Sequence, residues 1–354
     1  MTSSAGEWLR GSGPHSDVVI SSRVRLARNL AGFQFVNRAN RRQRYEVLDL
    51  CRGQIMTKRL ADNTIWVQLG DSPAIDRQLL VERHLISREH AKASPDLPRG
   101  VAIGSDETFA VMVNEEDHLR IQVLRSGMQL GEAFDQINRI DDILEQKLDF
   151  AYSRRFGYLT ACPTNVGTGI RVSVMMHLPA LKLTGEIEKV KRAARDMHLA
   201  VRGLFGEGSD ALGDLYQVSN QTTLGRTERE VLADFERSII PQIIGYEQQA
   251  RQALIRQREK QLDDKVWRAW ATLTNARVIG TDETLSLLSH VRLGIHLNRL
   301  EQIDIRTVNE LFLLSQPAHL QRVTGQEMTP AARRIARADL LRQRLAARGA
   351  AGGG

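Results

Sequence analysis

The feature that most constrains this chain is the run Cys162-Pro163-Thr164-Asn165-Val166-Gly167-Thr168-Gly169-Ile170-Arg171. Pro163 fixes one backbone torsion and the two glycines free others, which predicts a tight loop. The β-branched residues 170–176 then predict a strand that carries Arg171. A thiol, a glycine loop and an arginine this close together favour an anion-handling site. The alternative is a turn before a buried strand with a core cysteine, and the lack of Gly-Lys-Ser/Thr excludes a Walker A loop.

Size and composition narrow the class of protein. The 354 residues suffice for two domains, and 42% hydrophobic with 26% charged residues is typical of a soluble globular protein. No run of 18 apolar residues predicts a membrane span, and residues 1–13 lack the apolar core of a secretion signal. Two cysteines, Cys51 and Cys162, argue against a disulfide framework, and no Cys/His cluster has zinc spacing. We expect a cytoplasmic protein with no membrane partner and no protein-bound metal.

The net charge of +7 comes with a strong excess of arginine over lysine. This bias fits either a GC-rich genome or contact with phosphate, where the planar guanidinium is favoured. The positive charges are spread along the whole chain, so direct nucleic-acid binding is not predicted.

The predicted secondary structure divides the chain into two parts. The first predicts strands at residues 18–20, 64–69, 108–113, 119–124, 170–176 and 215–219, with helices at 41–60, 72–83, 128–148 and 186–198. From Thr227, which forms a capping box with Glu230, helices are predicted at residues 227–262, 263–276, 281–294, 304–315 and 329–348. This pattern favours an α+β fold, a mainly antiparallel sheet flanked by helices and then an all-α domain. The expected units are a flexible N-terminus (1–16), a sheet domain (17–245), a helical domain (246–348) and a flexible tail (349–354).

Charged residues gather at a few points of the first part. Arg23 and Arg25 share one side of an extended stretch, where they repel unless an anion lies between them; the alternative is a solvated strand edge. His84 ends a predicted helix and could stack on a base or complement the helix dipole. Residues 114–118 hold three acids and a histidine, which fits a cationic ligand or a solvated turn. Glu207 lies between glycines in a loop that could bring its carboxylate close to a ligand.

These pieces resemble one family. Four segments resemble, in order, the signature blocks of the ATP:guanidino phosphotransferases, which include arginine and creatine kinases: Ser21-Ser22-Arg23-Val24-Arg25, Asn114-Glu115-Glu116-Asp117-His118-Leu119-Arg120, the Cys162–Arg171 run and Val201-Arg202-Gly203-Leu204-Phe205-Gly206-Glu207. Residues 82–87, residues 158–181 and the helical C-terminal part are similar to the bacterial protein-arginine kinase (McsB) branch. The first block begins at residue 21, so the large N-terminal domain of metabolite kinases has no counterpart.

The resemblance implies a nucleotide site for ATP with Mg²⁺. Five arginines, namely Arg23, Arg25, Arg120, Arg171 and Arg202, would surround the ATP phosphates in place of a P-loop, Mg²⁺ would bridge phosphate oxygens, and His84 would lie at the nucleotide. The full implied set is Ser21, Ser22, Arg23, Val24, Arg25, His84, Arg120, Arg171, Val172, Ser173, Val174, Met175, Arg202, Gly203, Leu204, Phe205, Gly206 and Glu207.

The implied acceptor is a guanidinium, whose pKa exceeds ~12, so it arrives protonated and non-nucleophilic. Two carboxylates could orient it by paired hydrogen bonds and remove a proton as the N–P bond forms. By resemblance these are Glu116, which we expect as the base, and Glu207, which we expect as the clamp. Cys162 would help to align the guanidinium and would tune the rate without acting as a covalent nucleophile.

One segment departs from the McsB branch. An Arg-Asp-x-x-Arg-Ala motif near the C-terminus of that branch resembles a phosphoarginine-binding pocket, and the matching run here is Arg333-Arg334-Ile335-Ala336-Arg337-Ala338. Arg334 replaces the acid, which puts phosphoarginine-dependent control in question. Arg333 and Arg337, with Ala338, could still grip a phosphate from one helix face. The alternative is a basic surface helix.

The resemblance implies an ATP-dependent protein-arginine kinase of bacterial stress response and protein quality control. Its implied partners are proteins with exposed arginines, an activator protein, a Clp ATPase/protease, a heat-shock repressor and a second copy of the chain. One alternative is a kinase of free arginine or another small guanidine. A second is a basic helical nucleic-acid-binding regulator with a vestigial kinase site.

Overall fold

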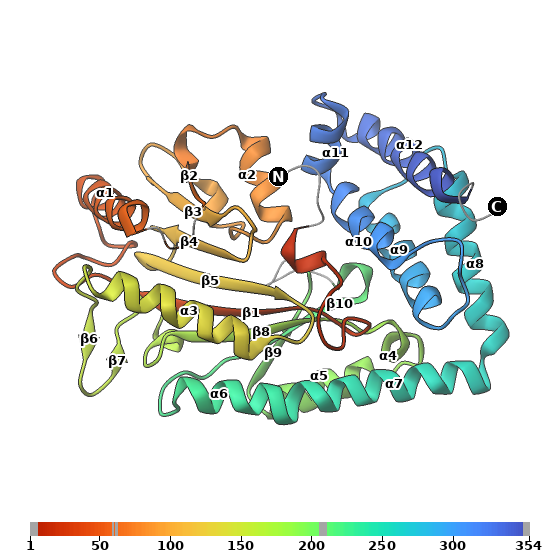
Figure 1. Cartoon of the computed structure of the whole chain (residues 1–354), viewed down its shortest axis with the longest axis horizontal. Coiled ribbons are helices and arrows are strands. Elements are labelled where there is room, and N and C mark those ends of the chain that lie inside the picture. Colours follow the sequence, from red (N-terminus) through yellow and green to blue (C-terminus); the bar gives the residue numbers. More distant parts are fainter. Residues whose placement is uncertain (1–5, 59, 61–62, 205–210, 350–354) are drawn as a thin grey trace.

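The computed structural model describes residues 6–58, 60, 63–204 and 211–349 (Figure 1). Its centre is an eight-stranded sheet of antiparallel neighbours in the order β2-β3-β4-β5-β1-β8-β10-β9. The strands are β1 (Val19–Arg28), β2 (Thr64–Gln68), β3 (Gly100–Gly104), β4 (Phe109–Val113), β5 (Leu119–Ser126), β8 (Ile170–His177), β9 (Leu199–Arg202) and β10 (Leu215–Asn220), and β6 (Tyr152–Ser153) with β7 (Gly157–Tyr158) forms a separate hairpin. The predicted fold class is confirmed.

Helix α3 (Leu130–Glu145) covers one face of the sheet against β1 and β5. Its apolar residues recur at helical spacing, so one stripe is buried: Leu130, Phe134, Ile137, Ile140 and Leu144. Val24 and Leu26 of β1 belong to the same core, because alternate side chains of a strand point to opposite faces. Arg23 and Arg25 therefore point to the other face. The remaining helices around the sheet are α1 (Arg41–Lys58), α2 (Ala74–Glu82), α4 (Pro179–Leu183) and α5 (Ile187–Asp196).

The C-terminal helices begin with a long rod beneath the sheet in Figure 1, made of α6 (Glu228–Asp234), a π-helical turn (Phe235–Ile239) and α7 (Ile240–Gln257). The others gather at one end of the sheet: α8 (Glu259–Asn275), α9 (Thr281–His296), α10 (Ile305–Leu314), α11 (Pro317–Thr324) and α12 (Pro330–Gly349). The single helix predicted over residues 227–262 is thus interrupted, and α11 was not predicted. The expected boundary at residues 245/246 falls inside α7.

The N-terminal segment differs from the predicted flexible stretch over residues 1–16. Glu7–Leu9 form a 3₁₀ turn that packs on β1 and β5, with Trp8 and Leu9 only 3% and 2% exposed. The Glu7 carboxylate also accepts a hydrogen bond from the Ser126 backbone N–H (3.1 Å). Burial of these two apolar side chains anchors a segment that is otherwise small and polar. Residues 1–5 and 350–354 lie outside the described residues, and Gly349 ends α12.

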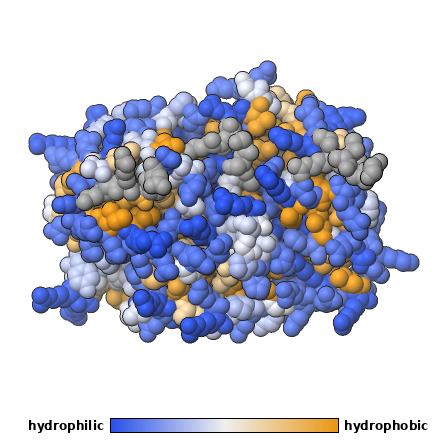
Figure 2. Space-filling model, viewed as in Figure 1, coloured by the Kyte–Doolittle hydropathy of each residue, from blue (hydrophilic) through white to orange (hydrophobic). Residues whose placement is uncertain are grey.

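The face shown in Figure 2 is mainly hydrophilic, and its apolar side chains form separate patches. Within the described ranges, no helix combines the length and the apolar character that a membrane span requires.

Candidate active site

A cavity of about 960 Å³ lies on the sheet face opposite α3. It is lined by all five arginines predicted to hold phosphate, Arg23, Arg25, Arg120, Arg171 and Arg202, and by His84, Glu116 and Cys162. These residues are far apart in the sequence, and the sheet brings them together. Of the two alternatives for Arg23 and Arg25, the structure favours the anion site, because both side chains line a cavity and neither lies on a solvated strand edge.

Strand register explains this convergence. β1 carries Arg23 and Arg25 on one face, and its neighbour β8 places Arg171 directly opposite Arg25. On the other side of β1, Arg120 of β5 pairs with Ala27. β9 brings Arg202 opposite Gln217 of β10. Four strands therefore direct positive charge into one cavity.

The arginines are costly to hold together without an anion. Burial, together with the nearby charges of Arg120 and Arg171, lowers the pKa of Arg23 to about 9. Burial and then Arg23, Arg120 and Arg171 also lower the pKa of Arg25 well below its usual range. The Arg25 Nε is buried and has no hydrogen-bond partner among the described residues. A polyphosphate would supply the missing acceptor and the opposing charge.

Neutral side chains behind the arginines fix their direction. Arg23 donates from one terminal nitrogen to the Gln217 side-chain oxygen (2.6 Å) and from Nε to Ser173 Oγ (3.3 Å). Arg171 donates to Ser219 Oγ (3.0 Å). These partners orient the guanidinium groups without neutralising them. The sequence analysis missed Gln217 and Ser219, although their alternation on a predicted strand placed both on one face.

In the acidic loop between β4 and β5, Glu115, Asp117 and His118 are held by neighbouring residues, whereas Glu116 lines the cavity. Glu115 forms an ion pair with Arg120 and accepts a hydrogen bond from Ser87 Oγ. Burial would raise the pKa of Glu115, but Arg120 and Ser87 outweigh burial and lower this pKa to about 2. Asp117 accepts from the Asn29 side chain (2.6 Å). His118 Nδ1 accepts from the backbone N–H of Leu30 (3.0 Å).

Glu116 is the acid of this loop that lines the cavity. Burial raises its pKa above the ordinary value, and the charges of Asp117 and Glu115 add to burial while Arg120 opposes it. A carboxylate with a raised pKa is a stronger proton acceptor than a free glutamate. Glu115, Asp117 and His118 are 5% exposed or less, so the loop is not a solvated turn.

The Cys162 loop has the predicted geometry. Gly167 and Gly169 have φ of +113° and +66°, and a side chain at Gly169 would lie 2.7 Å from the Ala27 carbonyl oxygen. Cys162 Sγ lies 3.0 Å from Thr164 Oγ1, and both residues line the cavity. Cys162 is therefore not a core cysteine, in contrast to the buried Cys51, whose pKa burial raises to about 12.

His84 lies at the cavity wall just beyond the end of α2, in a left-handed conformation with φ of +58°. Its ring packs edge-on against the Trp8 ring, with 4.4 Å between the ring centroids. Burial, with Arg23 and Arg88, lowers the pKa of His84 to about 3, so the ring is neutral at physiological pH. Arg88, which the sequence analysis did not single out, also lines the cavity, four residues after His84 on the same segment.

Several predicted nucleotide residues do not face the cavity. Ser22, Val24, Val172 and Val174 are fully buried on the opposite sheet face, where Ser22 donates to the Gly127 carbonyl (2.8 Å). The signature blocks are continuous, but a strand presents only alternate residues to one face. The other predicted members take three positions: Ser21, Ser173 and Met175 line a small adjoining cavity beside His84, Leu204 lines the main cavity, and Gly203 is buried. Phe205, Gly206 and Glu207 lie outside the described residues.

The C-terminal candidates lie far from this cavity in the fold, on α12. Arg337 is 2% exposed and donates to the backbone carbonyls of Ser315 (2.7 Å) and Ile279 (3.1 Å). Arg333 donates to the Met328 carbonyl (2.9 Å), and Ala338 is fully buried. The structure therefore does not present Arg333 and Arg337 as an exposed pair.

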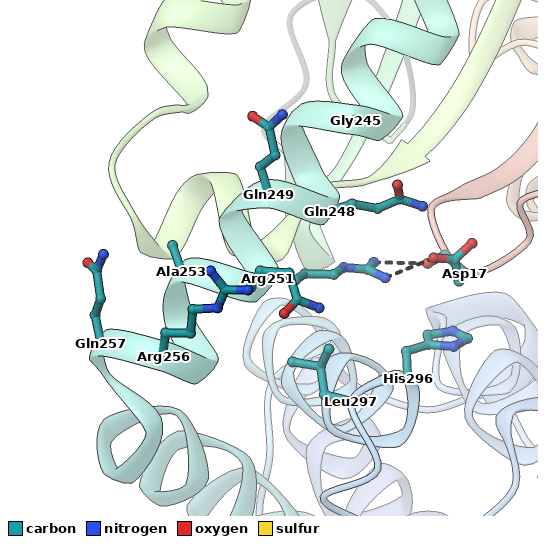
Figure 3. Close-up of a pocket in the computed structure, with 11 residues that line it drawn as sticks. Asp17, Gly245, Gln248, Gln249, Arg251, Ala253, Arg256, Gln257, His296 and Leu297 are labelled. Carbon is teal, nitrogen blue, oxygen red and sulfur yellow. Dashed lines mark hydrogen bonds and ion pairs between the residues drawn. The ribbon is translucent and has the colours of Figure 1, made fainter.

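A further cavity of about 810 Å³ lies between α7 and the end of α9 (Figure 3). Arg251 crosses it and pairs with Asp17 (3.0 Å). None of the predicted site residues lines it.

The chain was compared with protein families and known proteins. A family model described as "ATP:guanido phosphotransferase, C-terminal catalytic domain" matches residues 49–250, and one described as "Protein-arginine kinase McsB C-terminal domain" matches residues 259–351. The chain is 46% identical over 346 residues to a protein-arginine kinase of Halothermothrix orenii and 47% identical over 343 residues to one of Symbiobacterium thermophilum. Each match covers 96% of both chains.

Solved structures agree at the level of the catalytic fold. A duplicated taurocyamine kinase from Schistosoma mansoni aligns with a TM-score of 0.59 and 27% identity, covering 67% of this chain and 34% of that one. A lombricine kinase aligns with a TM-score of 0.56 and 28% identity, covering 65% and 66%. On these matches, the chain belongs to the ATP:guanido phosphotransferase family and, within it, to the protein-arginine kinases.

Proposed function

We propose that this chain transfers the γ-phosphoryl group of ATP to arginine side chains of proteins, in the cavity formed by β1, β5, β8 and β9. The observation that carries the proposal is the convergence of five arginines with Glu116 on one cavity. The arginines match a polyphosphate donor, and the glutamate matches a cationic acceptor. Phosphoryl transfer needs this positioning and charge neutralisation more than it needs a covalent helper.

The donor binds through its phosphates. Arg25 of β1 and Arg171 of β8 lie directly opposite each other on neighbouring strands, and their guanidinium groups would hold oxygens of the triphosphate between them. Gln217 orients the guanidinium group of the neighbouring Arg23, and Ser219 orients that of Arg171. His84, with its neutral ring beside Trp8, would contact the nucleotide at the cavity wall.

Mg²⁺ would enter with the nucleotide. Among the described residues there is no group of three or more His, Cys, Asp or Glu side chains arranged for a metal, so ATP oxygens would supply most of its ligands. When bound, Mg²⁺ would supply positive charge that offsets part of the phosphate charge. The arginine-rich lining fits a site in which the anion, and not the protein, holds the metal.

Glu116 prepares the acceptor. A substrate guanidinium is protonated and non-nucleophilic, so one N–H must give up its proton as that nitrogen attacks the γ-phosphorus. Glu116 would take this proton, the N–P bond would form, and the bond from phosphorus to the bridging oxygen would break to release ADP. Glu207 remains our candidate for a second carboxylate that orients the guanidinium. Cys162, held beside Thr164, would contact the acceptor without forming a covalent bond.

The cellular context is part of the same proposal. The curated relatives are named protein-arginine kinases, and the C-terminal match is to a domain named for such a kinase. These names support protein substrates. A role in bacterial stress response and protein quality control in the cytoplasm is what the family resemblance implies, and we propose it here. An activator protein, a Clp ATPase/protease, a heat-shock repressor and a second copy of the chain are the proposed partners.

Phosphorus NMR separates protein from small-molecule substrates. The chain is incubated with ATP and Mg²⁺, with free L-arginine in one tube and an unfolded arginine-rich protein in the other. We expect an acid-labile N–P signal on the protein only, and no signal with Glu116→Gln. A signal on free arginine alone would contradict the protein substrate. If neither tube gives a signal, the same assay is repeated with a bacterial cell extract as a source of the proposed activator protein.

A further inference from the structure

A buried polar cluster joins the catalytic sheet to the C-terminal helices where α2 meets α11 (Figure 1). Glu82, the last residue of α2, is 1% exposed. Its carboxylate accepts hydrogen bonds from the backbone N–H groups of Ala318 (2.9 Å) and His319 (3.0 Å). These N–H groups belong to the first turn of α11, which has no partner for them within the helix. One carboxylate thus caps α11 from the end of α2.

The His319 side chain extends this cap. Its Nδ1 lies 2.7 Å from the Glu82 carboxylate, and its Nε2 lies 3.2 Å from Nη1 of Arg83. Arginine can only donate, so Nε2 accepts, and Nδ1 carries the proton that is donated to Glu82. Arg83 also forms an ion pair with Glu107, in which Nε donates to both carboxylate oxygens (2.8 and 3.0 Å). Four buried side chains are therefore linked by hydrogen bonds in the order Glu82, His319, Arg83 and Glu107.

These linked side chains lie next to the nucleotide cavity. Glu82, Arg83 and His84 are consecutive; the first two contact His319, and the third lines the cavity. The backbone of His84 is in the left-handed region, which a residue with a side chain adopts only where its surroundings hold it. Gln122 of β5 holds this backbone from the sheet side by donating to the His84 carbonyl (2.8 Å). α11 holds the same turn from the other side.

We propose that His319 is a positioning residue of the nucleotide site, which acts by fixing the end of α2 so that the His84 ring faces ATP. The proposal rests on the role given to His84 under the proposed function. It assigns the C-terminal helical region a role in the nucleotide site, through the contact of His319 with Glu82, which lie 237 positions apart in the sequence. His319 itself does not line the cavity.

A control is needed because removal of any buried hydrogen-bond partner lowers stability. Ser289 of α9 provides it. Its hydroxyl donates to Asp214 (2.6 Å) and contacts His177 Nε2 (2.9 Å), so it also joins a C-terminal helix to the sheet and is fully buried. Neither Asp214 nor His177 lines the nucleotide cavity. Ser289→Ala should therefore reduce stability without touching the turn at His84.

The experiment uses the full chain and measures Tm, kcat and KM for ATP at saturating protein substrate. For His319→Ala we expect KM for ATP to rise about 2- to 30-fold, with a smaller change in kcat. His319→Asn, whose amide can still donate to Glu82, should recover part of this loss and serves if the alanine variant does not fold. Ser289→Ala should lower Tm by a similar amount and leave KM for ATP unchanged.

The double variant His84→Ala/His319→Ala identifies the route. If His319 acts through His84, the double variant has the same KM for ATP as His84→Ala alone. Additive increases in KM, or a lower Tm of His319→Ala and His319→Asn with unchanged KM, would overturn the positioning role while His84 kept its own. An unchanged KM in His84→Ala would instead remove the nucleotide role of His84 and the inference with it.

Discussion

Arg25 of β1 and Arg171 of β8 lie directly opposite each other in the central sheet. Like charges directly opposite each other destabilise a sheet, and burial makes the arrangement costlier. Burial and then the neighbouring arginines lower the pKa of Arg25 well below its usual range, and the negative charge of Glu115 offsets only part of this effect. The pair is therefore a structural cost that a bound polyphosphate offsets.

Replacement of Arg25 separates stability from function. Arg25→Met keeps the length of the side chain and removes the buried charge, so Tm without nucleotide should stay the same or rise. Loss of a charge-assisted contact to phosphate should weaken ATP binding at least about tenfold. Thermal unfolding with and without ATP measures both effects. A lower Tm in free enzyme together with unchanged ATP affinity would contradict the assignment.

Glu115 should stabilise the fold at neutral pH and not in acid. Its pKa is lowered to about 2 from an ordinary value of 4.5, so its contribution is present above pH 4.5 and is lost as the pH falls toward 2. The shift corresponds to about 3 kcal/mol. Chemical denaturation at several pH values should show a flatter acid limb for Glu115→Gln. A parallel acid limb in both proteins would argue against the Arg120 ion pair.

Cys162→Ser tests whether the sulfur forms a bond to phosphorus. The cysteine is held beside Thr164 at the cavity wall and is assigned to alignment of the acceptor. The serine variant should lose less than about 100-fold in kcat, the scale of a misaligned reactant, and should bind ATP normally. Rapid-quench analysis should find no phosphorylated enzyme on the path. Complete loss of turnover with normal ATP binding would favour a covalent role.

Local patterns predicted the part of the site that depends on strand alternation. Arg23 and Arg25 were placed on one side of an extended stretch, and the structure directs both into the cavity. The same alternation separates them from Ser22 and Val24, which the continuous signature block included with them. The block carries sequence similarity, but the strand decides which side chains reach a ligand.

Other features depend on contacts that no local pattern contains. The opposition of Arg25 and Arg171 follows from strand register across a long loop, and the contact of Glu82 with α11 follows from helix packing. In the loop at residues 114–118, which has no regular period, the local pattern did not separate the cavity-lining Glu116 from the anchoring Glu115, and only the family resemblance singled out Glu116. Their pKa values move in opposite directions because only Glu115 is paired with Arg120.

The most direct test of the account compares Glu116→Gln with the unaltered chain in single-turnover phosphoryl transfer, with ATP affinity measured on the same samples. Removal of the proton acceptor should slow transfer by about 10²- to 10⁴-fold, while the arginines keep ATP affinity unchanged. Glu115→Gln, measured alongside, should affect stability more than rate. A Glu116→Gln variant that transfers phosphate at the normal rate would contradict the assignment of Glu116 and, with it, the proposed mechanism of this cavity.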